Sequence, residues 1–212
     1  MSSRIMILTV LSLLIFGTSA FAAPMYADTA YDYTPGLNVG TARSITGNAL
    51  DAPDASLRAD DNDIRFLSLG IGSYDSSLPA GTDYTGNGYG GSVYFSFASN
   101  FTGWATIYET TYSRSGYNEF ASVLGSLDGL TWTFLGDINN QNVDADGGYT
   151  VTFSGIYKFL KVVDTTALNG GVLADGFDID AVKVNPTPVP GAVWLLGSGL
   201  VGLVGLRRRF SA

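Results

Sequence analysis

Acidic residues are the side chains of this sequence that could bind a metal ion. Three aspartates and one asparagine occupy residues 60–63, and Asp175, Asp178 and Asp180 lie close together further along the chain. Carboxylate and amide oxygens are the ligands that Ca²⁺ prefers, in sets of six to eight. In a strand, Asp178 and Asp180 would share one face, where like charges repel unless solvent or a metal ion screens them. Two interpretations stay open, a calcium site and a solvated charged face.

The absence of two residue types excludes several classes of site. The chain contains no His and no Cys, so a Ser-His-Asp triad, a cysteine nucleophile, a disulfide and the usual zinc ligand sets are all excluded. Glu109 and Glu119 are its two glutamates. Paired carboxylates can support glycoside hydrolysis, but nothing in the sequence marks a raised pKa or a cleft. We therefore predict a non-enzymatic protein with no catalytic residues.

Tyrosines in the Gly-rich stretch 73–91 are candidates for ligand contact. Tyr84 and Tyr89 lie in this stretch, which is predicted to be one long loop. Loops of this length in a compact domain are often functional, and tyrosine rings offer apolar faces on which sugar rings can stack. Tyr84 and Tyr89 are therefore candidate ligand-binding residues. The alternative is that these rings only cover the edges of a β-sandwich.

The regular segments of the chain between these residues are predicted to be strands. Short apolar runs, alternating or clustered and separated by Gly, Asn, Asp and Ser, are typical of β-structure. The eight runs are 64–69, 92–97, 104–109, 120–125, 131–135, 149–153, 157–163 and 177–184. They predict an all-β fold, a jelly-roll sandwich of about eight strands over residues 48–185. Residues 23–47 are expected to form a loosely ordered lead-in.

The N-terminus has the pattern of a secretory signal peptide over residues 1–22. Arg4 precedes an apolar stretch at residues 5–16, and Ala20 and Ala22 flank Phe21 in an A-x-A cleavage site. We expect export through the Sec translocon and cleavage after Ala22.

The C-terminal segment, residues 186–212, is predicted to contain a transmembrane helix. From Val189 the apolar run is 18 residues long, close to the roughly 20 needed to cross a bilayer. Trp194 suits the membrane interface, and the three arginines at 207–209 suit a cytoplasmic stop. The alternative is a buried C-terminal helix of a soluble domain, which three consecutive arginines fit poorly.

The charge of the region between these segments is strongly negative. The chain has 11 basic and 19 acidic residues, and four arginines but no acids lie in the two terminal segments. Residues 23–185 therefore carry 7 basic and 19 acidic residues, a net charge of −12. Such a charge argues against nucleic acid as a partner, because phosphates require basic patches.

The C-terminal segment resembles the PEP-CTERM sorting signal, in its VPLPA-type variant. The match follows in order a Pro-x-Pro pair, a Trp-Leu-Leu-Gly-Ser-Gly block and a basic cluster, although Thr187, Val189 and Gly191 depart from the VPLPA lettering. The residues of the motif are Pro188, Val189, Pro190, Trp194, Arg207, Arg208 and Arg209. The resemblance implies an inner-membrane intermediate and cleavage by an exosortase-type membrane protease. It also implies delivery to the surface or extracellular matrix of a Gram-negative bacterium.

The central region resembles galactose-binding-like jelly rolls, including discoidin-like domains. The resemblance rests on residues 48–54, 66–70, 126–132, 157–164 and 175–182. In these jelly rolls a structural Ca²⁺ often ties an early loop to the final strand. By position, the resemblance implicates Asp51 or Asp54 together with Asp178 or Asp180. Asp51 and Ala55 stand where the usual Ala-Leu-Gly-Ala-Pro-Asp-Gly motif has glycines.

The sequence thus indicates the localisation of the protein more clearly than its molecular function. We expect an exported surface or extracellular-matrix protein, sorted through its tail and associated with exopolysaccharide. The alternative function is a lectin-like carbohydrate-binding module with a calcium dependence.

Overall fold

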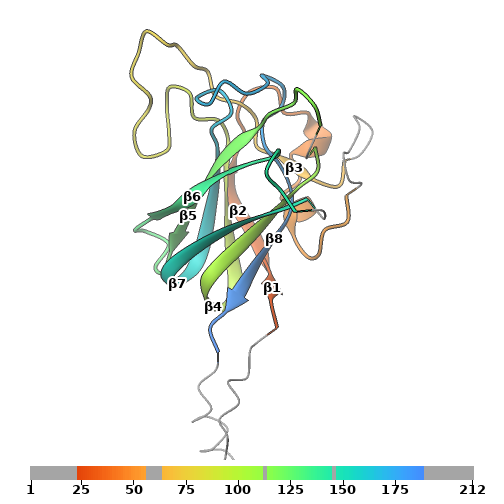
Figure 1. Cartoon of the computed structure of the whole chain (residues 1–212), viewed down its shortest axis with the longest axis vertical. Helices are drawn as coiled ribbons and strands as arrows, with labels where there is room; N and C mark the ends of the chain where they lie inside the picture. The colour runs from red at the N-terminus through yellow and green to blue at the C-terminus, as the bar shows by residue number, and fades with distance from the viewer. Residues whose placement is uncertain (1–22, 56–63, 112–113, 145–146, 189–212) are drawn as a thin grey trace, which may run out of the picture. The chain divides into compact units, whose positions relative to one another are not determined.

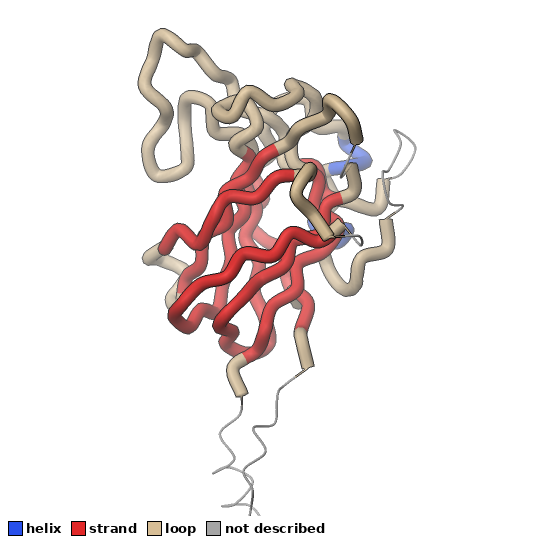
Figure 2. Tube along the Cα trace, viewed as in Figure 1, coloured by secondary structure: helices blue, strands red, loops and turns tan. Residues whose placement is uncertain are grey.

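The chain forms an antiparallel β-structure in the computed structural model, which describes residues 23–55, 64–111, 114–144 and 147–188 (Figure 1). Residues Ala23–Thr187 make one compact unit. Its strands are β1 (Met25–Tyr26), β2 (Thr29–Thr34), β3 (Leu67–Ser68), β4 (Ser92–Glu109), β5 (Phe120–Ser126), β6 (Thr133–Asn139), β7 (Gly148–Asp164) and β8 (Asp178–Pro186). Two short 3₁₀-helices, η1 (Thr41–Arg43) and η2 (Thr46–Ala49), precede β3. The prediction of an all-β fold with about eight strands is confirmed (Figure 2).

A long ribbon made of β4 and β7 organises the sheet. The two strands pair from Ser92 opposite Val163 to Tyr108 opposite Gly148, through irregularities after Ser96 and after Thr102. Along its other edge, the first half of β4 pairs with β2 and the second half with β8. The second half of β7 pairs with β5, and β5 in turn pairs with β6. Each half of the ribbon therefore belongs to a different set of neighbouring strands.

The core lies on one face of this ribbon because its apolar residues alternate. In β4, Val93, Phe95 and Phe97 are buried, whereas the residues between them are more exposed. Side chains at every second position of a strand point to the same face, so this pattern gives one apolar face. Leu160 and Val162 of β7 join the same hydrophobic cluster. Burial of these side chains is the main stabilising contribution expected for such a fold.

The structure corrects several expected boundaries. The runs 92–97 and 104–109 are parts of the single strand β4, and 149–153 and 157–163 are parts of β7. Their Gly- and Ser-containing centres looked like turns, but backbone pairing continues past these centres through the irregularities. The expected lead-in, residues 23–47, contributes β1 and β2, which pair with β8 and β4. It is therefore ordered by neighbours that lie far away in the sequence.

The stretch 73–91 is a long loop, as predicted, and is drawn in yellow in Figure 1. Asn87 holds it together, because its side-chain amide donates hydrogen bonds to the carbonyl oxygens of Asp75 (3.1 Å) and Pro79 (2.9 Å). The backbone N–H of Asp75 donates in return to the side-chain oxygen of Asn87, at 2.8 Å.

The terminal predictions fall largely outside the described residues. The signal peptide at 1–22, with Ala20 and Ala22, and the sorting segment from Val189 onward, with Trp194 and the arginines 207–209, are not among them. Within residues 23–188, less the internal gaps, no helix is long and apolar enough to cross a membrane.

Candidate functional site

A groove on the outer face of the sheet is a candidate for a ligand site. It has a volume of about 260 Å³. This is near the lower end of ligand pockets, at about 300 Å³. It lies across strands β4, β7 and β8, with one residue from the loop before β7. Its lining residues are Trp104, Thr106, Tyr108, Asp144, Thr150, Thr152 and Lys183.

Strand periodicity positions the groove. Ala105 and Ile107 point into the core, so Trp104, Thr106 and Tyr108 point to the opposite face of β4. Cross-strand register completes the arrangement, since Trp104 lies opposite Thr152 and Thr106 lies opposite Thr150. Facing residues of neighbouring strands meet side by side in this way.

Polar contacts fix the side chains in the middle of the groove. The hydroxyl groups of Thr106 and Thr150 share a hydrogen bond of 2.7 Å. The ammonium group of Lys183 donates to the hydroxyl oxygen of Tyr108 at 2.5 Å and lies 5.1 Å from the centre of its ring. The groove is therefore an ordered surface and not a set of independent exposed side chains.

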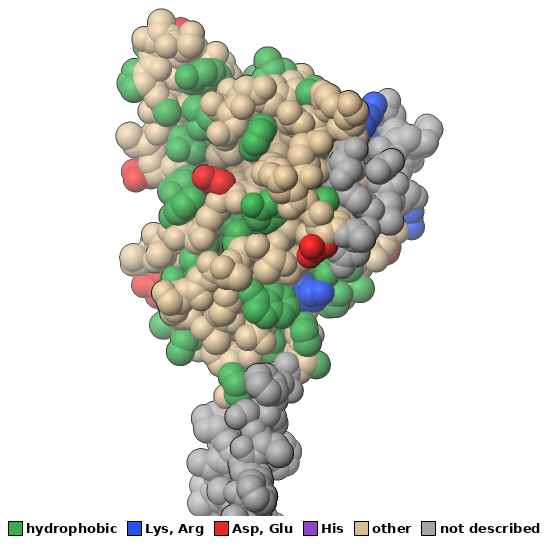
Figure 3. Space-filling model, in the orientation of Figure 1, with side chains coloured by type: hydrophobic (Ala, Val, Ile, Leu, Met, Phe, Trp, Pro, Cys, Tyr) green, Lys and Arg blue, Asp and Glu red, His purple; other side chains and the backbone are tan. Residues whose placement is uncertain are grey.

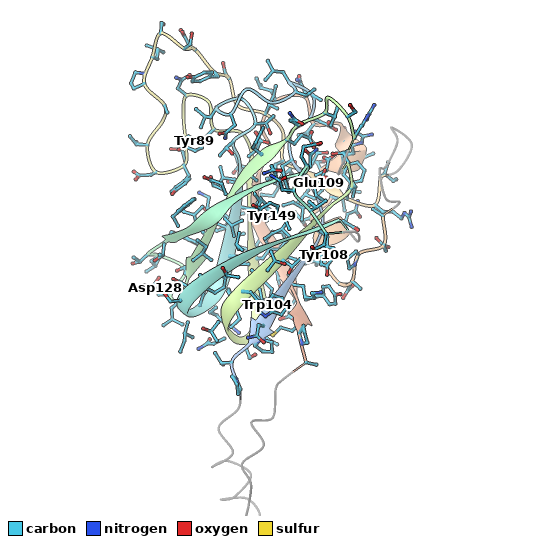
Figure 4. The ribbon with its side chains drawn as sticks, in the orientation of Figure 1. Tyr89, Trp104, Tyr108, Glu109, Asp128 and Tyr149 are labelled. Atoms are coloured by element: carbon cyan, nitrogen blue, oxygen red, sulfur yellow. The ribbon has the colours of Figure 1, made fainter. Side chains whose placement is uncertain are left out.

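The groove combines the groups that a sugar requires. Trp104 is a half-buried indole, and Asp144, Thr150 and Thr152 are exposed polar side chains. An indole face can stack on the apolar face of a sugar ring while carboxylate and hydroxyl groups bind its hydroxyls. On the face shown in Figure 3, hydrophobic side chains gather next to basic and acidic side chains. Figure 4 shows Trp104 and Tyr108 along β4.

The tyrosines predicted to bind ligand form a separate aromatic cluster. Tyr84 and Tyr89 are half-buried and lie 5.7 Å apart, ring centre to ring centre, in an edge-to-face arrangement. Tyr84 also stacks on Phe134 of β6, at 6.1 Å and 11° between the ring planes. These contacts hold the long loop against the sheet. They favour the interpretation in which the tyrosines cover a sheet edge.

The four aspartates predicted to bind calcium do not converge on one point. Oδ1 of Asp180 accepts hydrogen bonds from the backbone N–H groups of Asp54 (3.3 Å) and Ala55 (3.1 Å), which ties the early loop to the final strand directly. The carboxyl groups of Asp51 and Asp54 belong to exposed residues. Asp178 receives a hydrogen bond of 2.5 Å from the hydroxyl of Ser68. The calcium prediction for these four residues together stays a prediction.

A bulge explains why Asp178 and Asp180 meet different partners. Tyr108 and Glu109 are consecutive on β4 but lie opposite Ala181 and Ile179, so β8 has one extra residue there. Both aspartates are also buried, at 1% and 4% exposure, so the interpretation as a solvated charged face is wrong. The acidic run at 60–63 lies outside the described residues.

The two glutamates lie in the interior and not in a cleft. Glu109 is 2% exposed and Glu119 is 0% exposed. Together with Asp178 they form the one group of three or more acidic side chains, within the described parts of the chain, whose ligand atoms all lie within 4.8 Å of one another. The sequence identified each of these residues but not their meeting, because they come from β4, from the segment before β5 and from β8.

Sequence reasoning also missed the groove. The alternation of Trp104, Thr106 and Tyr108 was a usable signal for a second face of β4, although Trp104 alone of the three is partly exposed and Thr106 and Tyr108 are buried. The register that brings Thr150, Thr152 and Lys183 beside them depends on pairing between distant strands. No local pattern encodes that register.

Comparisons with known proteins identify distant structural likeness only. No protein-family model matches the sequence, and a comparison with curated proteins finds no match. The C-terminal domain of a chitobiase from Bacteroides fragilis is 16% identical, with a TM-score of 0.37, over 47% of this chain and 64% of that chain. Truncated AlyQ with CBM32 and alginate lyase domains is 11% identical, with a TM-score of 0.45, over 79% of this chain and 35% of that chain. CpGH89CBM32-5 from Clostridium perfringens, in complex with GalNAc-β-1,3-galactose, is 14% identical, with a TM-score of 0.42, over 74% of this chain and 93% of that chain.

This chain spans 64% of the length of the first of these structures and 35% of the length of the second. Identities and scores this low carry no argument about a ligand. The assignment of a site therefore depends on the residues of this chain.

Proposed function

We propose that this chain is an exported, non-enzymatic protein that binds carbohydrate through the groove around Trp104. The observation that carries the proposal is the combination, in one ordered groove, of an aromatic face with exposed hydroxyl and carboxylate groups. The sheet would then be a galactose-binding-like jelly roll, as the sequence motifs imply. The terminal segments support export and retention at the cell surface or in the extracellular polysaccharide.

The charge of the domain favours a neutral glycan. Residues 23–185 carry a net charge of −12, and the groove itself contains one basic and one acidic side chain, Lys183 and Asp144. A polyanionic polysaccharide would be repelled by the field of the whole domain. A neutral sugar meets no such barrier and can use both charged groups as hydrogen-bonding partners.

Substitution of Trp104 tests this proposal. Trp104→Ala removes the stacking surface, and aromatic anchors in binding sites contribute about 2 kcal/mol or more. We expect at least a tenfold loss of affinity for neutral extracellular polysaccharide, measured by affinity electrophoresis against a panel of neutral and acidic polymers. Circular dichroism would check that the variant is folded.

Trp132→Ala is the matched control. Trp132 is also half-buried, but its ring packs edge-on against Tyr94, 5.1 Å away, and does not line the groove. This variant should bind like the unmodified protein. Two results together would contradict the proposal: unchanged binding by Trp104→Ala, and loss of binding in a Tyr84→Ala/Tyr89→Ala double variant. They would assign the binding site to the long loop at residues 73–91.

Sorting through the C-terminal segment is the second part of the proposal. It follows from the motif that includes Pro188, Val189 and Pro190, with an exosortase-type membrane protease as the partner. The transmembrane helix that the sequence predicts after this motif would hold the chain in the inner membrane until cleavage.

A further inference from the structure

Three buried carboxyl groups from different elements meet inside the domain. Glu109 ends β4, Glu119 precedes β5 and Asp178 begins β8. Their ligand oxygens lie within 4.8 Å of one another, and their exposures are 2%, 0% and 1%. Figure 4 shows Glu109 next to Tyr108 on β4. We call Glu109, Glu119 and Asp178 the carboxylate centre.

The carboxylate centre has fewer hydrogen-bond donors than its oxygens require. Oε2 of Glu109 and Oε1 of Glu119 are buried and have no hydrogen-bond partner. Buried acceptors without partners cost free energy, so nearly all such atoms in folded proteins are paired with a donor, a water or an ion. Two such acceptors on neighbouring carboxyl groups can be satisfied together by one ion that binds between them.

The hydroxyl of Thr111 shows the same shortage of protons. It lies 2.5 Å from Oε1 of Glu109 and 2.9 Å from Oε2 of Glu119, and it accepts a hydrogen bond from the side-chain amide of Asn140 at 3.1 Å. A hydroxyl carries a single proton, so it can donate to one of these carboxylates but not to both. The other contact brings two oxygen atoms together with no proton from Thr111 between them.

The surrounding charge is negative as well. Asp175 lies next to the centre, since the hydroxyl of Ser68 contacts both Asp178 (2.5 Å) and Asp175 (3.3 Å). Arg43 forms an ion pair with Asp175 at 2.5 Å and offsets one of the four negative charges. Buried carboxylates of like charge cost free energy unless a cation joins the group.

We propose that Glu109, Glu119 and Asp178 bind one divalent cation, with Ca²⁺ as the preferred ion. All three ligands are hard carboxylate oxygens, and no nitrogen or sulfur ligand is available because the chain has no His or Cys. Ca²⁺ accepts carboxylates in bidentate geometry, which would use the oxygens that now have no partner. Mg²⁺ keeps several waters and fits a buried site less well.

This site differs from the ligand set that the sequence motifs imply. It shares Asp178 with that set, but it takes its other two ligands from Glu109 and Glu119. Its position suggests a structural role, because one ion would tie the end of β4 to the start of β8 and to the segment that leads into β5. The inference does not depend on carbohydrate binding.

Thermal unfolding of the full-length protein, with calcium or with excess EGTA, tests the proposal. Calcium at a hundredfold excess over its dissociation constant stabilises a one-site protein enough to raise Tm by about 5–10 °C at this chain length. Isothermal titration with CaCl₂ should give one ion per chain, and MgCl₂ should bind at least tenfold more weakly.

Glu119→Gln is the decisive variant, because the amide keeps the shape of the side chain and adds a donor to the centre. This variant should fold without metal, lose the calcium-dependent rise in Tm and bind Ca²⁺ at least tenfold more weakly. Asp128→Asn, which changes an exposed carboxylate in the turn before β6, is the matched control and should keep the full rise. A protein whose Tm is the same in Ca²⁺, Mg²⁺, Mn²⁺ and EGTA, and which contains no metal by elemental analysis, would overturn the proposal. A calcium response that Glu119→Gln retains would overturn it as well.

Discussion

Two aspartates show how the surroundings of a side chain decide its charge in this protein. Asp128 accepts hydrogen bonds from the backbone N–H groups of Leu130 and Thr131, both at 2.8 Å. These bonds, led by the one from Thr131, lower the pKa of Asp128 to about 2. Asp164 is buried, and its burial raises its pKa to about 6 although Thr166 and Phe177 donate hydrogen bonds to it.

The turn at Asp128 gives a prediction with a defined pH dependence. Because the folded-state pKa of Asp128 lies below its unfolded value near 3.9, its charge stabilises the fold above that value. This contribution is lost as the pH falls through about 2. We expect Asp128→Asn to have a lower Tm than the unmodified protein at pH 7. The two Tm values should converge as the pH approaches 2, in scanning calorimetry between pH 2 and 7.

A difference in Tm that stays constant over this range would show that the charge of Asp128 does not stabilise the turn. The turn itself was predictable from the sequence. Asp128 followed by Gly129 is a turn signal, and Gly129 has the positive φ of 75° that such turns need.

At the scale of elements, the start of β4 depends on a close backbone approach. A side chain at Gly91, immediately before β4, would place its Cβ 1.8 Å from the carbonyl oxygen of Leu69 and 2.7 Å from that of Thr34. Both neighbours are backbone atoms and cannot move aside cheaply. We expect Gly91→Ala to lower the free energy of unfolding by about 1–3 kcal/mol, measured by urea denaturation.

Gly40→Ala serves as the control for this substitution. Gly40 has an ordinary φ of −73°, and a Cβ there would meet nothing within 4 Å. Its unfolding free energy should stay within about 0.5 kcal/mol of the unmodified value, or rise slightly because alanine restricts the unfolded chain. Equal stability of the two variants would mean that the loops around Gly91 relax without cost.

The elements also show what the sequence could and could not predict. Strands with a clear alternation were found, as at Val93, Phe95 and Phe97, because burial on one face leaves a period of two in the sequence. β2 was missed, because Asp32 with its positive φ of 47° and a register shift interrupt its pattern. The groove and the carboxylate centre depend on cross-strand register and on a bulge. Both arise from pairing between segments that are far apart in the chain.

For the whole molecule, the terminal segments predict a chain that is cut at both ends. We expect intact mass spectrometry of protein from the cell surface or medium to show a chain that begins at Ala23 and ends near Pro188–Pro190. The second cut should be absent from cells that lack the exosortase-type protease. A full-length C-terminus in both strains would contradict sorting by cleavage and would indicate a retained tail.

The proposed function depends on binding of a neutral carbohydrate in the groove around Trp104. The most direct test is NMR titration of the protein with neutral oligosaccharides, watching the indole N–H signals of its tryptophans, assigned by substitution. If the groove binds the sugar, the Trp104 signal shifts and saturates while the Trp132 signal stays in place. A titration in which Trp104 does not move, while another region shifts or no signal shifts at all, would contradict it.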